Sequence, residues 1–239
     1  MLYRGGHSLR ATMRGQVDRG ARWGVVLSVV LGLGAMVRYP GGTPLDPATA
    51  HYSLNRNFLS DLGMTIAYDG QSNRIGAALF VTSLLLLVAS ILIILAGLVS
   101  RFTSTAAARM CARAAGLVGL MTAAAFVAVA FTPENRLMAL HVRATLLAFR
   151  LVPVAAALLA AAAWYDGGRQ RRIAVMLTLL SAVLALYAAF LAGGPSVASP
   201  SGLQANVIAQ KVVTVVTVGV FLFLSAGAPA REAVTDQRE

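Results

Sequence analysis

Six long apolar segments alternate with short polar connections along the chain. They cover residues 23–38, 75–99, 114–131, 139–163, 173–193 and 205–227. Each is close to the roughly 20 residues that an α-helix needs to cross the hydrocarbon layer of a bilayer, and none shows the alternating pattern of a barrel strand. The pattern therefore predicts an all-α, polytopic membrane protein with six transmembrane helices in one bundle.

The composition agrees with this prediction. Of the 239 residues, 58% are hydrophobic and only 12% are charged, and the mean hydropathy is +0.73. Such a chain has too little polar surface to cover a water-soluble globule. Because no connection is long enough to bury its own core, we expect one transmembrane domain at 23–228. It lies between a basic tail without regular structure, 1–22, and a second tail, 229–239.

Arginines are distributed unequally between alternate connections. Thirteen lie in the tails and connections on the side of the two termini, and four lie on the other side: Arg38, Arg56, Arg74 and Arg136. Since cytoplasmic loops retain basic residues during insertion, this bias predicts that both termini are cytoplasmic. The longest connection, residues 39–74, is then extracytoplasmic. The same distribution explains the net charge of +11, and no basic stretch interleaved with aromatic residues suggests nucleic-acid binding.

Several kinds of chemistry are excluded by the residue inventory. Cys111 is the only cysteine, so the chain can form neither an intrachain disulfide nor a site of several thiolates. Metal-binding histidine motifs, glycine-rich phosphate loops and dinucleotide fingerprints do not occur. We therefore expect no metal and no cofactor.

Basic residues inside the apolar segments are the first candidates for function. Arg143 and Arg150 are seven residues apart, on one face of the fourth segment, and Lys211 lies at a similar depth in the sixth. Charged side chains within a span usually face a bundle interior or a cavity, so we expect these three to cluster there. Pro153 predicts a kink beside Arg150.

Asp61 is the best counter-charge for this cluster, and two interpretations of it stay open. In the first, Asp61 pairs with Arg143 or Arg150 to hold the long connection down, or caps a short helix together with Ser60. In the second, Ser60, Asp61 and His141 join the basic residues in a polar pocket for an anionic lipid head group or a small anion.

Two further functions are weighed against lipid association. Ser60, Asp61, His51 and His141 could assemble into an intramembrane lipid hydrolase or transferase, although no spacing between them requires it. A small-solute transporter would show inverted repeats and broken helices, and the sequence shows neither. The preferred hypothesis is a non-enzymatic, lipid-associated or accessory protein. Its expected partners are membrane lipids, anionic lipids among them, and a second copy or another membrane protein.

Four ordered motifs give the chain a family resemblance. They are NFLSDLG, DGQSNRIGAALF, FTPENRLMALHVRATLLAF and SGLQANVIAQKV. In these motifs the chain resembles the bacterial and archaeal domain-of-unknown-function 998 family, six-helix membrane proteins similar in layout to the Frag, DRAM and Sfk group. No activity is established for the family, which has an acidic–basic pair where this chain has Gln210 and Lys211.

The resemblance implies a location and a set of site residues. It implies the cytoplasmic (plasma) membrane of a bacterium or archaeon. It also adds Asn73 to the predicted ligand-binding set, which becomes Ser60, Asp61, Asn73, His141, Arg143, Arg150 and Lys211. The other positions that it marks are Gly63, Pro133, Gly202 and Gln210.

Overall fold

The structure is a computed structural model that describes residues 5–167 and 170–226. This part of the chain holds six helices, each long and apolar enough to cross a membrane. They are α1 (Gly5–Arg38), α2 (Arg74–Val99), α3 (Ala106–Phe131), α4 (Glu134–Tyr165), α5 (Arg171–Gly193) and α6 (Pro200–Ala226). The prediction of an all-α, multi-pass membrane protein is confirmed.

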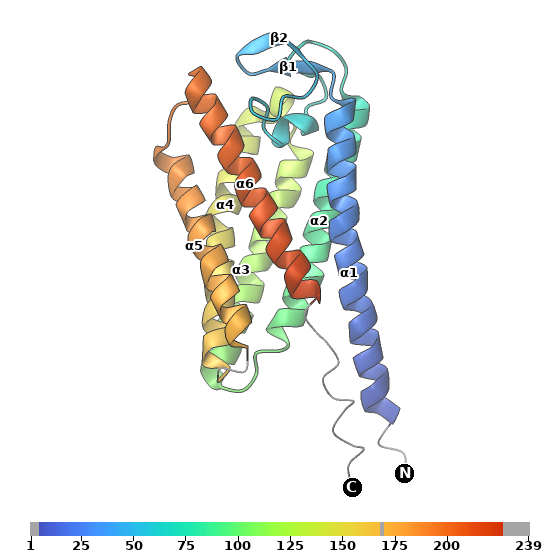
Figure 1. Cartoon of the computed structure of the whole chain (residues 1–239), viewed down its shortest axis with the longest axis vertical. Helices are drawn as coiled ribbons and strands as arrows, with labels where there is room; N and C mark the ends of the chain where they lie inside the picture. The colour runs from blue at the N-terminus through green and yellow to red at the C-terminus, as the bar shows by residue number, and fades with distance from the viewer. Residues whose placement is uncertain (1–4, 168–169, 227–239) are drawn as a thin grey trace.

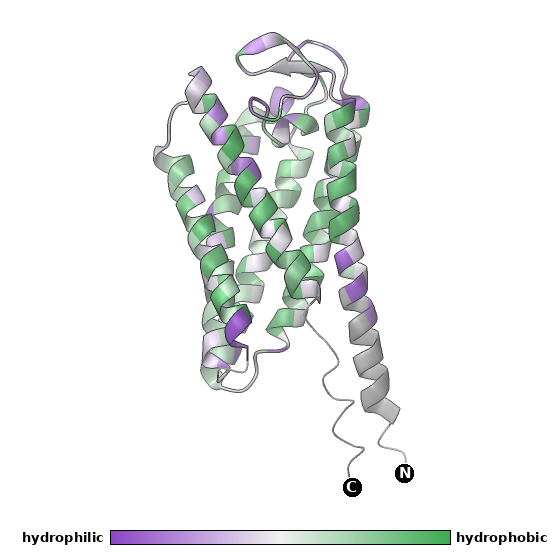
Figure 2. Cartoon of the chain, in the orientation of Figure 1, coloured by the Kyte–Doolittle hydropathy of each residue, from purple (hydrophilic) through white to green (hydrophobic). Residues whose placement is uncertain are grey.

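The helices stand side by side in one bundle (Figure 1). The closest pairs are α3 with α4, α1 with α2, and α4 with α5, and α6 packs on both α5 and α1, so the last helix closes the bundle against the first. Apolar residues cover most of the helix lengths, whereas strongly polar residues gather near the two ends (Figure 2). This distribution suits a bilayer that surrounds the middle of the bundle.

Small side chains allow α3 and α4 to approach closely. Ala108, Ala112 and Ala115 of α3 are fully buried in one apolar cluster with Ala162 and Ala163 of α4. Small residues at helix contacts increase backbone packing, which drives helix association in lipid. Ala162 and Ala163 end the alanine-rich stretch 155–163 of α4, so this stretch packs in the most extensive helix–helix interface of the described bundle.

The first helix differs from the prediction. α1 begins at Gly5, although its apolar part begins only at Arg19. Residues 5–22 are therefore helical and not the predicted irregular tail. They contain no proline and several good helix formers, so nothing in them stops the helix from continuing. The predicted tail at 229–239 lies outside the described residues.

The long connection folds back over one end of the bundle, and we call residues 39–73 the cap. It contains a hairpin of β1 (Gly41–Thr43) and β2 (Asp46–Ala50) and a 3₁₀ turn, η1 (Ser60–Gly63). Gly42 has φ +80°, and a Cβ at this position would meet the backbone of Asp69 and the side chain of Tyr68. Only glycine suits this site, which packs the hairpin onto the rest of the cap.

The irregularity of α4 is not at Pro153, where the sequence predicts a kink. It lies at Leu137, whose backbone is non-helical at φ −131° and ψ 40°. The carbonyl of Pro153 accepts a hydrogen bond from Ser181 of α5 at 3.0 Å, so the proline region is tied to its neighbour. The break at Leu137 sets the first turn of α4 apart and brings Glu134 next to His141.

Candidate functional site

Asp61, in η1, is the most deeply buried acidic group of the cap. Its side chain has no exposed surface. Oδ2 accepts hydrogen bonds from Nδ2 of Asn57 and from the backbone N–H of Phe58, both at 2.9 Å. Oδ1 has no hydrogen-bond partner among the described residues. The carboxyl group is therefore held firmly by one oxygen only.

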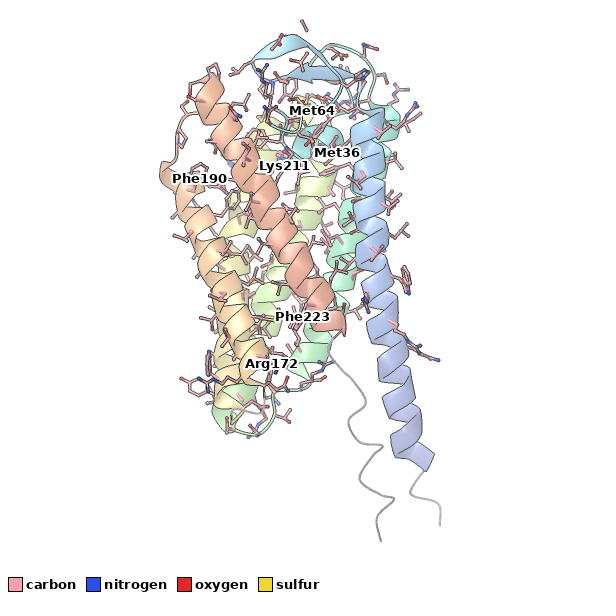
Figure 3. The ribbon with its side chains drawn as sticks, viewed as in Figure 1. Met36, Met64, Arg172, Phe190, Lys211 and Phe223 are labelled. Atoms are coloured by element: carbon pink, nitrogen blue, oxygen red, sulfur yellow. The ribbon has the colours of Figure 1, made fainter. Side chains whose placement is uncertain are left out.

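Two consecutive residues of α6 fasten the cap to the bundle. Nζ of Lys211 donates to the carbonyl of Asn57 at 2.5 Å and lies 5.3 Å from the centre of the Tyr52 ring. Oε1 of Gln210 accepts from the backbone N–H of Leu59 at 2.7 Å. Figure 3 labels Lys211 on the part of α6 that lies toward the cap. Two hydrogen bonds from α6 thus hold the cap segment just before Asp61.

Glu134 and His141 form an ion pair at the start of α4. Oε1 of Glu134 is 3.0 Å from Nε2 of His141, and both side chains are largely buried. Nδ1 of His141 lies 2.7 Å from the carbonyl of Thr132. Since both ring nitrogens face oxygen acceptors, the arrangement favours the imidazolium form. The side chain of Ser60 lies close enough to Glu134 to interact with its carboxylate, which places this pair next to the cap.

The electrostatics of Asp61 follow from its burial. Desolvation is the main cause that raises its pKa to about 8, and the nearby charge of Glu134 raises it further. The hydrogen bonds from Asn57 and Phe58, and then the charge of Lys211, act in the opposite direction. The phenols of Tyr39 and Tyr52 also have a raised pKa, first because they are buried and then because Asp61 is close.

Asn73 ties the end of the cap to the start of α2. Its Nδ2 donates to the carbonyls of Leu62 at 3.0 Å and Met64 at 2.9 Å. Its Oδ1 has no hydrogen-bond partner in the described part of the chain and lies where a side chain at Gly76 would stand. Asn73 is therefore a positioning residue of the cap.

Arg143 and Arg150 do not lie with the buried polar residues around Asp61. Both are exposed, and neither has an ion pair or hydrogen bond to the residues that the structure describes. Arg150 follows His141 by nine residues, and at about 100° per residue this places it on the opposite face of α4. The expected pairing of Asp61 with Arg143 or Arg150 is not formed, because His141 and the alanines occupy the inner face. Lys211 is the cation near Asp61.

A small basic cavity lies between the ends of α1 and α2 on the cap side. Its volume is about 290 Å³, and its lining consists of Arg38, Ser72, Asn73, Arg74, Ile75 and Gly76. In the sequence, Arg38 and Arg74 stand out only as topology signals. They end one helix and begin the next, so consecutive antiparallel helices place them at the same end of the bundle. That relation could have identified the pair.

A second, more open groove of about 590 Å³ lies at the other end of the bundle. It is lined by Arg171, Arg172, Val175, Met176 and Phe223 of α5 and α6. Figure 3 labels Arg172 and Phe223 at this end. The groove is remote from the cap and contains none of the predicted site residues.

The side chains of the cap and of the basic cavity suit proton and anion binding better than metal binding or nucleophilic catalysis. The described residues contain no group of three or more His, Cys, Asp or Glu side chains that could hold a metal ion. Ser60 faces Glu134, and His141 is engaged by Glu134 and Thr132, so Ser60 and His141 do not form a nucleophile and base pair. The groups can hold a proton, fasten the cap and, at Arg38 and Arg74, attract an anion.

Comparisons with known proteins leave the family open. The chain matches no protein-family model, no curated protein and no solved structure. The resemblance to the domain-of-unknown-function 998 family therefore depends on the four sequence motifs.

Proposed function

We propose that this protein is a lipid-associated membrane protein that binds an anionic lipid head group in the basic cavity between α1 and α2. The observation that carries the proposal is the cavity itself, where two exposed arginines, Arg38 and Arg74, face the same small space. Neither arginine has an ion pair or hydrogen bond within the described residues. Guanidinium groups bind phosphate oxygens in a two-point geometry, so an anion would complete this site.

The surroundings of the cavity suit an amphiphile. The cavity lies at the N-terminus of α2, where free backbone N–H groups favour anions. Directly below the two arginines, Val37 is 83% exposed and Ile75 is 58% exposed, which provides an apolar surface for acyl chains. A phosphate at the cavity and hydrocarbon along the helices is the layout of a phospholipid.

The orientation of the bundle is part of the proposal. Thirteen arginines on the side of the termini against four on the cap side favour cytoplasmic termini and an extracytoplasmic cap. We place the protein in the cytoplasmic membrane of a bacterium or archaeon, in keeping with its resemblance to the domain-of-unknown-function 998 family. The lipid would then belong to the outer leaflet.

The proposed site differs from the predicted one. Among the residues expected to bind the head group, Asn73 lines the cavity, whereas Ser60, Asp61, His141 and Lys211 serve the attachment of the cap. A hydrolase or transferase centred on Asp61 and His141 gains no support, because Asp61 is enclosed and Ser60 does not contact His141. A transporter gains none either, since no described helix is broken at mid-membrane.

Native mass spectrometry of the full-length protein in lipid nanodiscs tests the proposal. We expect Arg38→Gln with Arg74→Gln to lower the occupancy of an anionic phospholipid about tenfold or more, because charge-assisted hydrogen bonds contribute about 1.5–3 kcal/mol. The matched control is Arg143→Gln with Arg150→Gln, which removes the same charge from α4 and should leave the occupancy unchanged. Unchanged occupancy in the first variant would overturn the proposal.

A competition experiment distinguishes a bound lipid from a bound soluble anion. Inorganic phosphate and glycerol phosphate should compete poorly with nanodiscs that contain phosphatidylglycerol, because they lack the acyl chains. Zwitterionic nanodiscs should leave the cavity empty of lipid. Equal binding of inorganic phosphate would assign the cavity to a soluble anion.

A further inference from the structure

We propose that Asp61 is a proton-binding site, and that its proton decides how α6 holds the cap. The proposal is independent of the lipid cavity, because it uses other residues on the inner side of the cap. Its ligand is the hydrogen ion, and the responding group is the ammonium of Lys211.

The hydrogen bonding of Asp61 places the proton on Oδ1. Oδ2 already accepts two hydrogen bonds from Asn57 and Phe58. Oδ1 is buried and accepts none within the described residues. An ionised carboxylate spreads its charge over both oxygens, so it would leave half of that charge buried without a partner. A neutral carboxylic acid fits this site better than its anion.

The position of Lys211 gives a second argument. Its ammonium donates to the carbonyl of Asn57 and not to the carboxyl of Asp61, although Asn57 contacts both groups. A buried ion pair would be the expected arrangement if Asp61 were charged. The observed contact therefore fits a neutral acid at position 61.

The other ionisable groups around Asp61 act in the same direction or are engaged elsewhere. Glu134 is close enough for its charge to oppose a second negative charge, and its own ion-pair partner is His141. The phenols near the carboxyl are buried and neutral. Among the described residues, the ionisable groups around Asp61 are Tyr39, just after α1, Tyr52 and Tyr68 in the cap, Glu134 and His141 of α4, and Lys211 of α6.

Loss of the proton has a defined structural consequence. The Oδ1–H bond breaks, its electron pair stays on the carboxylate, and the proton passes to water. The new buried anion then attracts the nearest mobile cation, Lys211, away from the carbonyl of Asn57. One contact between α6 and the cap is exchanged for another, and the segment around Asn57 is released from Lys211.

Infrared titration of the full-length protein in nanodiscs tests the site. Protein labelled with ¹³C at aspartate carboxyl groups should show a carboxylic-acid band that disappears with a midpoint near pH 8, the value expected for Asp61. Asp61→Asn should remove this band, whereas Asp46→Asn should leave it, because Asp46 is a half-buried cap residue whose pKa is lowered by hydrogen bonds from Thr49 and Ala48. The labelled wild-type protein gives the result even if the Asp61 variant does not fold.

A second variant tests the role of Lys211. Lys211→Met removes the cation whose charge lowers the pKa of Asp61, so the midpoint should move to higher pH. An ordinary aspartate titrates near pH 4, so the absence of any aspartate carboxylic-acid band at pH 6 would overturn the proton site. An unchanged midpoint in Lys211→Met would overturn the coupling to α6.

Discussion

Single buried side chains give the cap its shape, because each of them bonds to backbone groups that are distant in sequence. Asn73 binds the carbonyls of Leu62 and Met64, and Asn57 binds the carbonyl of Gly42 as well as Asp61. A buried backbone carbonyl without a partner is costly, so each amide stabilises the fold of the segment that it serves. Replacing either asparagine should therefore destabilise the segment that it binds as well as its own position.

The stability of the protein should depend on pH through Asp61. The pKa is about 8 in the folded protein and roughly 4 in an unfolded chain, so the folded state binds the proton more tightly. The contribution is complete below about pH 4 and is lost as the pH rises toward 8, by at most about 1.4 kcal/mol per pH unit.

Thermal unfolding midpoints measured across this range should show the effect. The wild-type midpoint should fall relative to that of Asp61→Asn as the pH rises, because the amide cannot ionise. Asp46→Asn serves as the control, and its curve should not reproduce that of Asp61→Asn. Parallel wild-type and Asp61→Asn curves would contradict the prediction.

Gly76→Ala should destabilise the protein by about 1–3 kcal/mol, because the new Cβ would stand on Oδ1 of Asn73 and displace the amide that binds two cap carbonyls. Chemical denaturation in detergent measures the loss. Gly219→Ala on α6 is a matched control, since nothing lies within 4 Å of its added Cβ. That variant should be neutral or slightly more stable, and equal losses in both would contradict the packing argument.

At the scale of elements, the sequence predicts the positions of the helices well. It predicts less well which face of each helix is buried in the bundle. Four apolar segments begin and end within a few residues of their helices, whereas α1 and α3 start well before the predicted segments, at Gly5 and Ala106. Helix α4 shows why the rest could not be predicted. Its inner face is set by alanines and His141, and a charged residue such as Arg150 carries no information on which face is buried.

The cap and its anchors needed tertiary structure. The hairpin strands contain Gly, Pro and Asp, which have low strand propensity, so the local sequence predicts only turns. The contacts of Lys211 and Gln210 with the cap span about 150 positions of sequence. The sequence identifies Asp61 of NFLSDLG as a carboxylate that can face the bundle, but it does not identify the residues that surround it.

The attachment of α6 to the cap can be tested by proteolysis. Lys211→Met removes the bond to the Asn57 carbonyl, so the exposed Arg56 beside it should become more accessible. We expect tryptic cleavage after Arg56 to accelerate about tenfold, in line with a loss of roughly 1.4 kcal/mol in local stability. Val212→Ala, at the neighbouring exposed position, should cleave at the wild-type rate. Equal rates in both variants would show that Lys211 does not restrain the cap.

At the scale of the whole molecule, the outer face of α4 is the least expected surface. Arg143 and Arg150 are exposed within a helix that can cross the membrane, where an arginine is costly at the helix centre. A second copy of the chain or another membrane protein would be a suitable partner for this face. Without such a partner, the protein should be destabilised by these two exposed arginines.

Arg150→Leu should therefore stabilise the isolated protein in nanodiscs, by about 2.5 kcal/mol if the side chain remains near the bilayer centre. The unfolding midpoint in nanodiscs measures the effect. Leu147→Arg, on the same exposed face, is the opposite change and should lower the midpoint. A lower midpoint for Arg150→Leu would indicate that Arg150 already has a stabilising partner.

The hydrogen bonds between α6 and the cap can form only late in the synthesis of the chain. The segment from Asn57 to Leu59 leaves the ribosome long before Gln210 and Lys211, so four more helices and the first part of α6 are synthesised before the last two bonds of the cap can form. A chain that stops before α6 presents an unfinished cap with a free Leu59 N–H. The segment from Asn57 to Leu59 should therefore be cleaved faster in such a chain than in the finished protein.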